Sequence, residues 1–257
     1  MTPTKPDPRA RAFDRVVDAY ERGRPGYPPE AVDRLTTALD IGPRSTILDL
    51  GAGTGKLTKL LIGSGATVLA AEPLPNMRMQ LASSVPDAVA LAAKAEALPL
   101  RPKTVNAVMV AEAFHWFSFP EAVREIHHVL KPGGGLGLLW NWPAESGQKW
   151  TGQIRHVLDS YGKDARNFHT TPWRATLEQS GDFTRVSEAT IPWLFESTSD
   201  TLLARIESIS FIAELPSRER VEVLEEIEQI LQNDPETKDG AVISSPYNTH
   251  LFWCFTK

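Results

Sequence analysis

Apolar runs alternate with helical patterns between residues 45 and 141, and this alternation constrains the fold most strongly. Parallel strands need crossover connections, which helices of this length supply, and the crossovers are right-handed. Near-continuous apolar runs are typical of strands buried on both faces. The sequence therefore predicts a doubly wound α/β fold. The expected strands are 45–50, 67–72, 88–93, 105–112 and 134–141, with helices at 54–62, 76–84 and 120–130.

The segment before this alternation is predicted to be helical. Residues 9–21 place Phe13, Val16, Val17 and Tyr20 on one face by their spacing of three and four. A second helix is expected over 29–39, and residues 1–8, which are rich in Pro and Thr, are predicted to be disordered.

The segment after residue 142 is less regular. Two helical patterns flank 167–173 within 143–182, and the helix expected at 217–232 carries its apolar face on Val221, Leu224, Ile227 and Leu231. Further elements are a strand at 183–195, a helix at 199–213 and a closing strand at 247–256. Since no linker or repeat separates these parts, we predict a single domain, 1–257. Its parts are cap helices (9–40), a core (45–142) and a substrate-side segment (143–257).

Composition narrows the class of protein. The chain has 257 residues and a net charge of −5, which argues against a nucleic-acid partner. No run of about 18 apolar residues is present, so we expect no membrane span and a cytoplasmic location. The single cysteine, Cys254, is expected to be a buried strand thiol, and no Cys/His cluster has the spacing of a metal site. We expect a monomer or a homodimer.

The stretch ILDLGAGTGKLT, residues 47–58, joins a strand to a helix through a glycine-rich turn. Glycines at 51, 53 and 55 let the backbone turn tightly and approach a ligand closely. A helix starting near Thr54 would point its free amides at that ligand. Such a turn fits either NAD or S-adenosylmethionine (SAM).

Three positions, Asp49, Lys56 and Glu72, distinguish these cofactors. Lys56 replaces the third glycine of a dinucleotide fingerprint, and Asp49 would repel a pyrophosphate but attract the ammonium of an amino acid, directly or through water. Glu72, which closes the second strand, would accept hydrogen bonds from ribose hydroxyls. Ala95 and Glu96 would meet an adenine edge. The implied cofactor has an amino-acid end and no phosphate.

The chain resembles class I SAM-dependent methyltransferases of the methyltransferase type 11 kind, including trans-aconitate methyltransferase-like small-molecule enzymes. The matching segments are YERGRPGYP, ILDLGAGTGKLT, AAEPLPNM, AEALPL, AVMVAEAFHWF and VLKPGGGLGLLWN, within residues 13–142. The resemblance implies a Rossmann-like, seven-stranded, mostly parallel sheet with extra N-terminal helices and a helical insertion after the fifth strand. It places an antiparallel strand 247–256 between the fifth and sixth strands.

The resemblance also implies roles for individual residues, with SAM as donor and S-adenosyl-L-homocysteine as product. The methionine end of SAM would contact the glycine turn, and the ribose would contact Glu72. The adenine would contact the side chains that follow the second and third strands. The residues at the end of the fourth strand would lie beside the methionine carboxylate and the sulfonium. Tyr20 and Arg24, in the N-terminal segment, would cap the cofactor or contact the substrate. The residues so implied are Asp49, Gly51, Ala52, Gly53, Glu72, Pro73, Leu74, Met77, Ala95, Glu96, Ala111, Glu112, Ala113, Tyr20 and Arg24.

His115 is the candidate catalytic residue, because it follows the fourth strand, where open α/β sheets place their chemistry. It would act as a general base or orient the acceptor, and the alternative is a loop histidine bonded to the backbone. Trp116, Trp140 and Trp142 are expected to line the substrate pocket, although such rings also simply pack. An anionic acceptor would favour Arg24 or Arg174 nearby.

Three functions remain open from the sequence. The favoured one is methylation of a small organic molecule, with oxygen as the preferred acceptor atom. A second is a SAM-binding enzyme of secondary metabolism that catalyses cyclisation or rearrangement without methyl transfer. A third is an NAD-dependent oxidoreductase, against which Lys56 and Asp49 argue. The sequence AEAF at 111–114 replaces the N/D-P-P-Y/F motif of enzymes that methylate base amines.

Overall fold

The computed structural model describes residues 8–162, 167–238 and 240–257. These form two compact units, and β5, β6 and β7 contribute residues to both. One unit comprises 26–141, 166–191 and 249–257, and the other comprises the chain up to 25, 142–165 and 192–248. The predicted disorder of residues 1–8 falls almost wholly outside the described residues.

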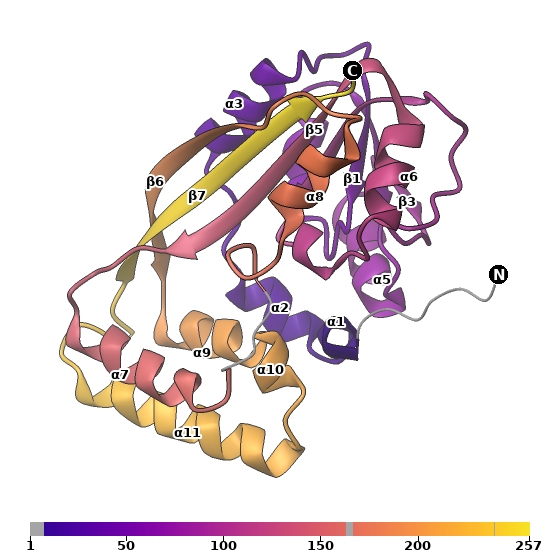
Figure 1. The fold of residues 1–257 in the computed structure, drawn as a ribbon. Coiled ribbons are helices and arrows are strands. Elements are labelled where there is room, and N and C mark those ends of the chain that lie inside the picture. Colours follow the sequence, from indigo (N-terminus) through magenta and orange to yellow (C-terminus); the bar gives the residue numbers. More distant parts are fainter. Residues whose placement is uncertain (1–7, 163–166, 239) are drawn as a thin grey trace. The chain divides into compact units, whose positions relative to one another are not determined.

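Seven strands form one sheet, as predicted (Figure 1). The pairs β1–β2, β2–β3, β1–β4 and β4–β5 are parallel. The yellow arrow of β7 points opposite to that of β5, and β7 lies between β5 and β6, which confirms the predicted place of the closing strand. In spatial order the strands are β3 (Val89–Leu91), β2 (Thr67–Ala71), β1 (Thr46–Leu50), β4 (Val105–Ala111), β5 (Leu130–Pro143), β7 (Ile243–Phe255) and β6 (Ser187–Ser197).

Helices cover both faces of this sheet. One face packs on α3 (Pro29–Ala38) and α4 (Lys56–Ile62), with Ile47, Met109 and Leu139 from the strands. The opposite face packs on α6 (Glu121–Val129) and α8 (Trp173–Ser180). The helix α5 (Pro75–Ser84) packs Leu81 against Ala70 of β2. Burial on both faces explains why the strands are apolar almost throughout.

The other unit is mainly helical. Its larger core joins α7 (Lys149–Asp159), α9 (Ser199–Glu207), α10 (Ser210–Ala213) and α11 (Ser217–Asn233). A smaller core joins α1 (Pro8–Ala12) and α2 (Val17–Gly23) to the same unit through small side chains. No helix in the described part of the chain has both the length and the apolar character needed to cross a bilayer.

Two predicted helices are broken. The helix expected at 9–21 is interrupted by the 3-10 turn η1 (Phe13–Arg15), because Val16 has φ −122° and ψ 32°. Its buried face is Ala12, Val16 and Ala19, whereas Phe13, Val17 and Tyr20 are only partly buried. The helix expected at 199–213 divides into α9 and α10, because Ile209 is extended, with φ −70° and ψ 132°.

The ends of several elements also differ from the prediction. The strands β5 and β7 begin four residues before the predicted positions, at Leu130 and Ile243, and β6 begins at Ser187. In α11 the buried residues are Val223, Ile227 and Leu231, while Val221, predicted on the apolar face, is 51% exposed. Partners in the sheet and the core, rather than local pattern, set these boundaries.

Candidate functional site

Two buried carboxylates lie at the ends of neighbouring strands. Asp49 in β1 is 1% exposed, and Glu72, directly after β2, is 5% exposed. Since β1 and β2 are parallel, their carboxyl ends meet at one edge of the sheet. Burial is the main cause of the raised pKa of Asp49, and the nearby charge of Glu72 adds to it.

Backbone amides fix the orientation of Glu72. The amide of Gly53 donates to Oε2 and the amide of Leu74 donates to Oε1, both at 2.9 Å. Arg78 Nη1 donates to the backbone oxygen of Glu72 at 2.8 Å. A carboxylate oxygen can accept two hydrogen bonds, so a carboxylate held in this way is compatible with further bonds from a diol.

Thr58 supports Asp49 from the first turns of α4. Its hydroxyl donates to Asp49 Oδ2 at 2.6 Å. Burial, aided by the charge of Glu72, raises the pKa of Asp49 from 3.8 to about 7, although the Thr58 hydrogen bonds oppose this rise. Thr58 was not among the predicted site residues, but it closes the quoted motif at 47–58, which is a signal that could have identified it.

Positive φ angles shape the glycine turn. Gly51, Gly53 and Gly55 have φ of 74°, 58° and 93°, a region that glycine adopts at little cost. A Cβ on Gly51 would lie 2.6 Å from the Cβ of Ala113, so no side chain fits there without movement. The turn therefore packs directly against the end of β4.

The backbone amides of the glycine turn donate hydrogen bonds to other atoms of the protein. Gly51 and Ala52 donate to the Ala71 oxygen at 2.9 and 3.1 Å, and Gly55 donates to the Ala52 oxygen at 3.0 Å. Together with the Gly53 bond to Glu72, these contacts differ from the predicted turn whose amides are free for a ligand. The helix α4 also begins at Lys56 rather than Thr54. This geometry suits a phosphate-free ligand better than a pyrophosphate, which needs several amide donors.

Thr54 provides a test of whether a ligand fits the turn. Its side chain is 2% exposed, and its hydroxyl has no hydrogen-bond partner among the described residues. Buried polar atoms are usually satisfied, and water or a ligand commonly completes those that the protein leaves unsatisfied. The turn thus fits a polar ligand beside Asp49 and Glu72.

Glu112 lies at the mouth of β4 in a left-handed conformation, with φ 54°. Its amide donates to the Leu139 oxygen at 2.9 Å, and its Oε1 accepts from the Asn141 amide at 2.6 Å. Glu112 therefore ties the ends of β4 and β5 together, and its neighbours Ala111 and Ala113 line the same edge. A role for these residues toward the donor stays a prediction.

The residues predicted near adenine lie in the same compact unit as Asp49 and Glu72. Met77 is 2% exposed in the first turn of α5, and Pro73 precedes that helix. Ala95 is 3% exposed and belongs to the main core, while Glu96 Oε1 accepts from the Ser118 amide at 2.7 Å. Their contacts with adenine stay a prediction.

The structure assigns Tyr20, Arg24 and Trp142 to the other compact unit. Arg24 Nε donates to the Ser208 hydroxyl and Arg24 Nη2 donates to the Ser208 backbone oxygen, both at 2.9 Å. The Arg24 guanidinium carbon also lies 5.5 Å from the centre of the Tyr20 ring. Trp142 is 39% exposed. Their predicted contacts with cofactor or substrate stay predictions.

His115 lies in the 3-10 turn η2 (Phe114–Trp116), two residues after Ala113. Trp140 Nε1 in β5 donates to His115 Nδ1 at 3.1 Å, and the two side chains are 6% and 1% exposed. The rings of His115 and Trp116 have centres 5.0 Å apart. The candidate histidine is therefore hydrogen-bonded to the side chain of Trp140, whereas the alternative expected a bond to the backbone.

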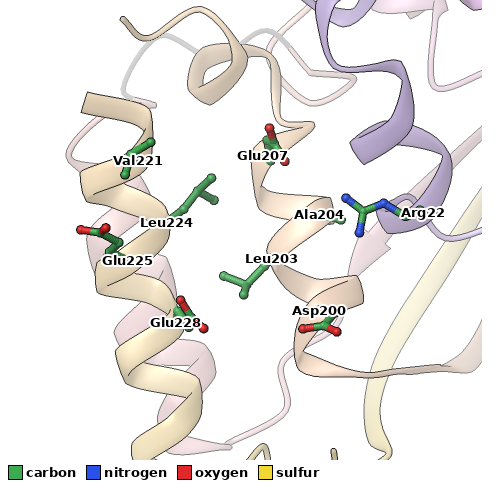
Figure 2. A pocket seen from close by; sticks show the side chains of 9 residues that line it. All are labelled: Arg22, Asp200, Leu203, Ala204, Glu207, Val221, Leu224, Glu225 and Glu228. Atoms are coloured by element: carbon green, nitrogen blue, oxygen red, sulfur yellow. The ribbon is translucent and has the colours of Figure 1, made fainter. Parts of the chain in front are cut away.

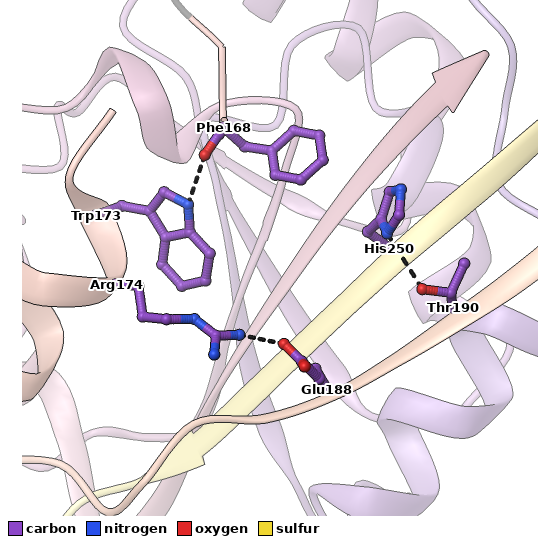
Figure 3. Close-up of polar contacts among 6 residues, drawn as sticks. All are labelled: Phe168, Trp173, Arg174, Glu188, Thr190 and His250. Carbon is purple, nitrogen blue, oxygen red and sulfur yellow. Dashed lines mark hydrogen bonds and ion pairs between the residues drawn. The ribbon is translucent and has the colours of Figure 1, made fainter. Parts of the chain in front are cut away.

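An aromatic cluster surrounds Trp140 in this unit. The Phe168 ring stacks on it at 5.1 Å, Trp173 lies 5.3 Å away, and Phe252 packs 4.9 Å from Trp173. Trp173 Nε1 donates to the Phe168 oxygen at 2.9 Å, as Figure 3 shows. Of this cluster only Trp140 was predicted to line the pocket, because the sequence separates the other rings by long distances.

Charged groups at the edge of the cluster are already paired. Arg174 lies over the Trp173 and Phe252 rings and forms an ion pair with Glu188 (Figure 3). Nearby, Thr190 Oγ1 and His250 Nδ1 are 3.2 Å apart. Burial, and then the charge of His169, lower the pKa of His250, while Glu188 opposes that shift.

A separate groove of about 320 Å³ lies in the mainly helical unit (Figure 2). Leu203 and Leu224 lie at its centre, with carboxylates from α9 and α11 around them. None of the predicted site residues lines it, so it is not the candidate site. Its lining is Arg22, Asp200, Leu203, Ala204, Glu207, Val221, Leu224, Glu225 and Glu228.

Cys254 is a buried strand thiol, as predicted. It is 2% exposed in β7, and burial raises its pKa to about 12. A thiol with such a pKa is a poor nucleophile near neutral pH.

Comparison with known proteins identifies the family of the chain. Residues 48–138 match the family model described as a methyltransferase domain. An uncharacterized methyltransferase of Mycobacterium tuberculosis is 37% identical over 238 residues, which cover 93% of each chain. An uncharacterized methyltransferase-like protein of Schizosaccharomyces pombe is 35% identical over 243 residues, which cover 94% of each chain.

Solved structures share the fold at low sequence identity. A protein assigned as a type II methyltransferase from Anaeromyxobacter dehalogenans superposes with a TM-score of 0.64 at 19% identity, covering 90% of this chain and 97% of that one. A Haemonchus contortus N-methyltransferase, solved with S-adenosylhomocysteine, gives a TM-score of 0.52 at 16% identity, covering 94% of this chain and 57% of that one. The chain belongs to the class I SAM-dependent methyltransferases.

Proposed function

We propose that this methyltransferase binds SAM at the glycine turn and transfers the methyl group to an oxygen atom of a small organic acceptor. The observation that carries the proposal is the pair of buried carboxylates Asp49 and Glu72 at the ends of adjacent strands. Glu72, oriented by two amides, would accept from the ribose hydroxyls. Asp49 would attract the ammonium of the methionine end.

When bound, SAM supplies a methyl group that is already activated by its positively charged sulfur. The protein then has to hold the donor, orient the acceptor and exclude water. Gly51 allows the turn to approach the end of β4, and the Thr54 hydroxyl can complete its hydrogen bonding on the donor. Ala111 and Ala113, at the same edge, have small side chains that would leave space for the donor.

Oxygen is the favoured acceptor atom. The motif of base-amine methylation is absent from residues 111–114, where AEAF stands instead. His115 and Trp140 form a buried hydrogen bond at the carboxyl ends of β4 and β5, where a hydrogen-bonding acceptor would be recognised. A small soluble acceptor is consistent with the acidic net charge of −5, which disfavours nucleic acid.

Binding measurements test the donor site. We expect isothermal titration to show binding of SAM and S-adenosylhomocysteine to the unmodified protein. Glu72→Gln removes the charge that favours the ribose bonds, so it should weaken both affinities roughly 10- to 100-fold. Glu178→Gln, an exposed change in α8 of the same unit, is the matched control and should leave them unchanged. Equal affinity in both variants would contradict the assignment of Glu72.

Methyl transfer is tested separately with SAM that carries a labelled methyl group. We expect label to move to oxygen in a panel of small carboxylic acids, alcohols and phenols. Turnover of an acceptor without label transfer would instead support the second function, in which SAM assists cyclisation or rearrangement. Failure of both SAM and S-adenosylhomocysteine to bind would contradict the donor site as well.

A further inference from the structure

Asn141, near the end of β5, forms hydrogen bonds with three other segments of the same compact unit. Its backbone amide donates to Glu112 Oε1 at 2.6 Å, and its Nδ2 donates to the Gly26 oxygen at 2.7 Å. The Thr249 hydroxyl donates to its Oδ1 at 2.7 Å. Since a backbone oxygen can only accept, the NH2 group must face Gly26 and Oδ1 must face Thr249. The orientation of the Asn141 side chain is therefore fixed.

These bonds join segments that lie far apart in the sequence. Gly26 is 115 positions from Asn141, and Thr249 is 108 positions from it. Gly26 and Thr249 each begin a stretch of the sheet-containing unit and Asn141 ends one, so all three lie where the chain passes between the two units. Thr249 is 0% exposed in β7, so its hydroxyl holds Asn141 from within the sheet. The side-chain bonds thus anchor the backbone near the end of β5.

The anchored backbone of Asn141 holds the end of β4 in turn. Glu112 has a left-handed backbone, with φ 54°, which persists in a residue other than glycine only where the surrounding structure holds it. Its Oε1 accepts from the Asn141 amide. The next residue, Ala113, packs against the glycine turn, where a Cβ on Gly51 would lie 2.6 Å from the Ala113 Cβ. A chain of contacts therefore runs from Thr249 in β7 through Asn141 and Glu112 to the glycine turn.

We propose that Asn141 is a positioning residue that holds the end of β4 against the glycine turn, and that donor affinity depends on it. This inference rests on the proposed function, because it concerns the donor site at the same turn. A site that is ordered before binding loses less conformational entropy when the ligand binds. Without the side-chain bonds of Asn141, part of the binding free energy would be used to order Glu112 and Ala113. Asn141 acts through these two residues, so it needs no contact with the donor.

Two substitutions of Thr249 separate the hydrogen bond from packing. Thr249→Val keeps the size of the buried side chain but removes the hydroxyl, whereas Thr249→Ser keeps the hydroxyl but removes a methyl group. We expect Thr249→Val to weaken S-adenosylhomocysteine binding roughly 3- to 10-fold, because the bond to Asn141 is lost. Thr249→Ser should keep the affinity of the unmodified protein. Titration calorimetry measures both, and a loss in Thr249→Ser as large as that in Thr249→Val would overturn the proposal.

Asn106 provides a matched control for Asn141. Its Oδ1 accepts from the Thr46 amide at 3.0 Å and from Lys131 Nζ at 2.8 Å, so it also joins neighbouring strands, but at their amino ends. We expect Asn141→Ala to weaken S-adenosylhomocysteine binding roughly 10- to 100-fold, because both side-chain bonds are lost. Asn106→Ala should lower the Tm but leave this affinity unchanged. Equal affinities in the two variants would contradict a specific role for Asn141.

Hydrogen exchange of the Asn141 backbone amide tests the link to Glu112 without any ligand. This amide is held in the bond to Glu112 Oε1, so it should exchange slowly in the unmodified protein. We expect faster exchange at Asn141 in Thr249→Val and no change in Asn106→Ala. Exchange that stays equally slow in Thr249→Val would overturn the positioning role. If exchange changes as expected but no variant and no unmodified protein binds SAM or S-adenosylhomocysteine, the proposed function and the effect on the donor fail, while the link between Asn141 and Glu112 stands.

Discussion

The unusual state of Asp49 shows how a single residue couples binding to stability. Its carboxyl group is removed from water in β1, next to the charge of Glu72, and its pKa is about 7. In the unfolded chain the same group has a pKa near 3.8. The folded protein therefore holds a proton on Asp49 between these two pH values that the unfolded chain releases.

We predict that Asp49→Asn stabilises the protein at high pH. Ionising Asp49 in the folded state costs on the order of 4 kcal/mol at most, and Asn avoids this cost while still accepting from Thr58. Below about pH 4 the two proteins should have equal stability, because Asp49 is protonated in both states. The advantage of Asn should grow from pH 4 to 7 and then level off. Urea unfolding at pH 4, 6 and 8 measures it, and an advantage that is constant over this range would contradict the cause.

We also predict that donor affinity depends on the ionisation of Asp49. Because an ionised carboxylate attracts the donor's ammonium group, SAM should bind more tightly at pH 8 than at pH 6. In Asp49→Asn this dependence should disappear. Titration calorimetry at both pH values measures it, and an unchanged pH dependence in the variant would assign the effect to another group.

Individual site residues differ in how well the sequence predicts them. Gly51, Asp49 and Glu72 follow from the chemistry of a short motif and a strand end. Thr58 belongs to the same motif, but its bond to Asp49, like the Trp140–His115 bond, joins side chains whose contact depends on how elements pack. Trp140 and His115 are 25 positions apart in the sequence, so no local pattern predicts their hydrogen bond.

At the scale of elements, α2 and α9 pack so closely that one glycine is required. A Cβ on Gly23 would lie 2.0 Å from the backbone nitrogen of Arg205 and 2.3 Å from the carbonyl carbon of Ala204. Those neighbours are backbone atoms of α9, so they cannot rotate away. The two helices can approach each other this closely because Gly23 has no side chain.

We predict that Gly23→Ala destabilises the protein by roughly 1–3 kcal/mol or more, because the helices must separate to admit a methyl group. Gly152→Ala is the matched control. Gly152 lies in α7, and a Cβ built there would have no atom within 4 Å. Alanine at this position should stabilise the protein by up to about 1 kcal/mol, because its helix propensity is higher than that of glycine. Thermal unfolding of both variants measures the difference, and equal effects would refute the packing explanation.

Periodicity predicts the existence of most elements but not their ends. The helix expected at 199–213 has continuous helical composition, yet Ile209 adopts an extended conformation and its neighbours on both sides are packed in the core. Similarly, residues 131–133 lie between the predicted helix and the predicted strand, but they belong to β5. In both cases contacts with residues distant in sequence outweigh local preference.

At the scale of the whole molecule, the strand order follows from the family resemblance, because periodicity alone cannot place the last strand between the fifth and sixth. What the sequence did not indicate is the division into two compact units, since no change of composition marks residues 25, 142, 192 or 248. Contacts between distant segments define such units, and they leave little trace in local sequence.

We predict that S-adenosylhomocysteine stabilises the protein as a whole. A ligand that binds only the folded state at 100 times its Kd adds about 2.7 kcal/mol. For a chain of this size that corresponds to a rise in Tm of roughly 5–10 °C. Scanning fluorimetry measures it, and Glu72→Gln should need a higher ligand concentration for the same rise. A Tm that is independent of the ligand would contradict donor binding.

The left-handed backbone at Glu112 limits how position 112 can change during evolution. A β-branched side chain would be strained at φ 54°. Glycine would adopt this backbone conformation without strain, but it would lose the hydrogen bond from the Asn141 amide. Only side chains that tolerate this backbone and still carry an acceptor oxygen of sufficient reach satisfy both demands. We expect relatives that depart from glutamate at this position to compensate near the end of β5, so that changes at the two places are inherited together.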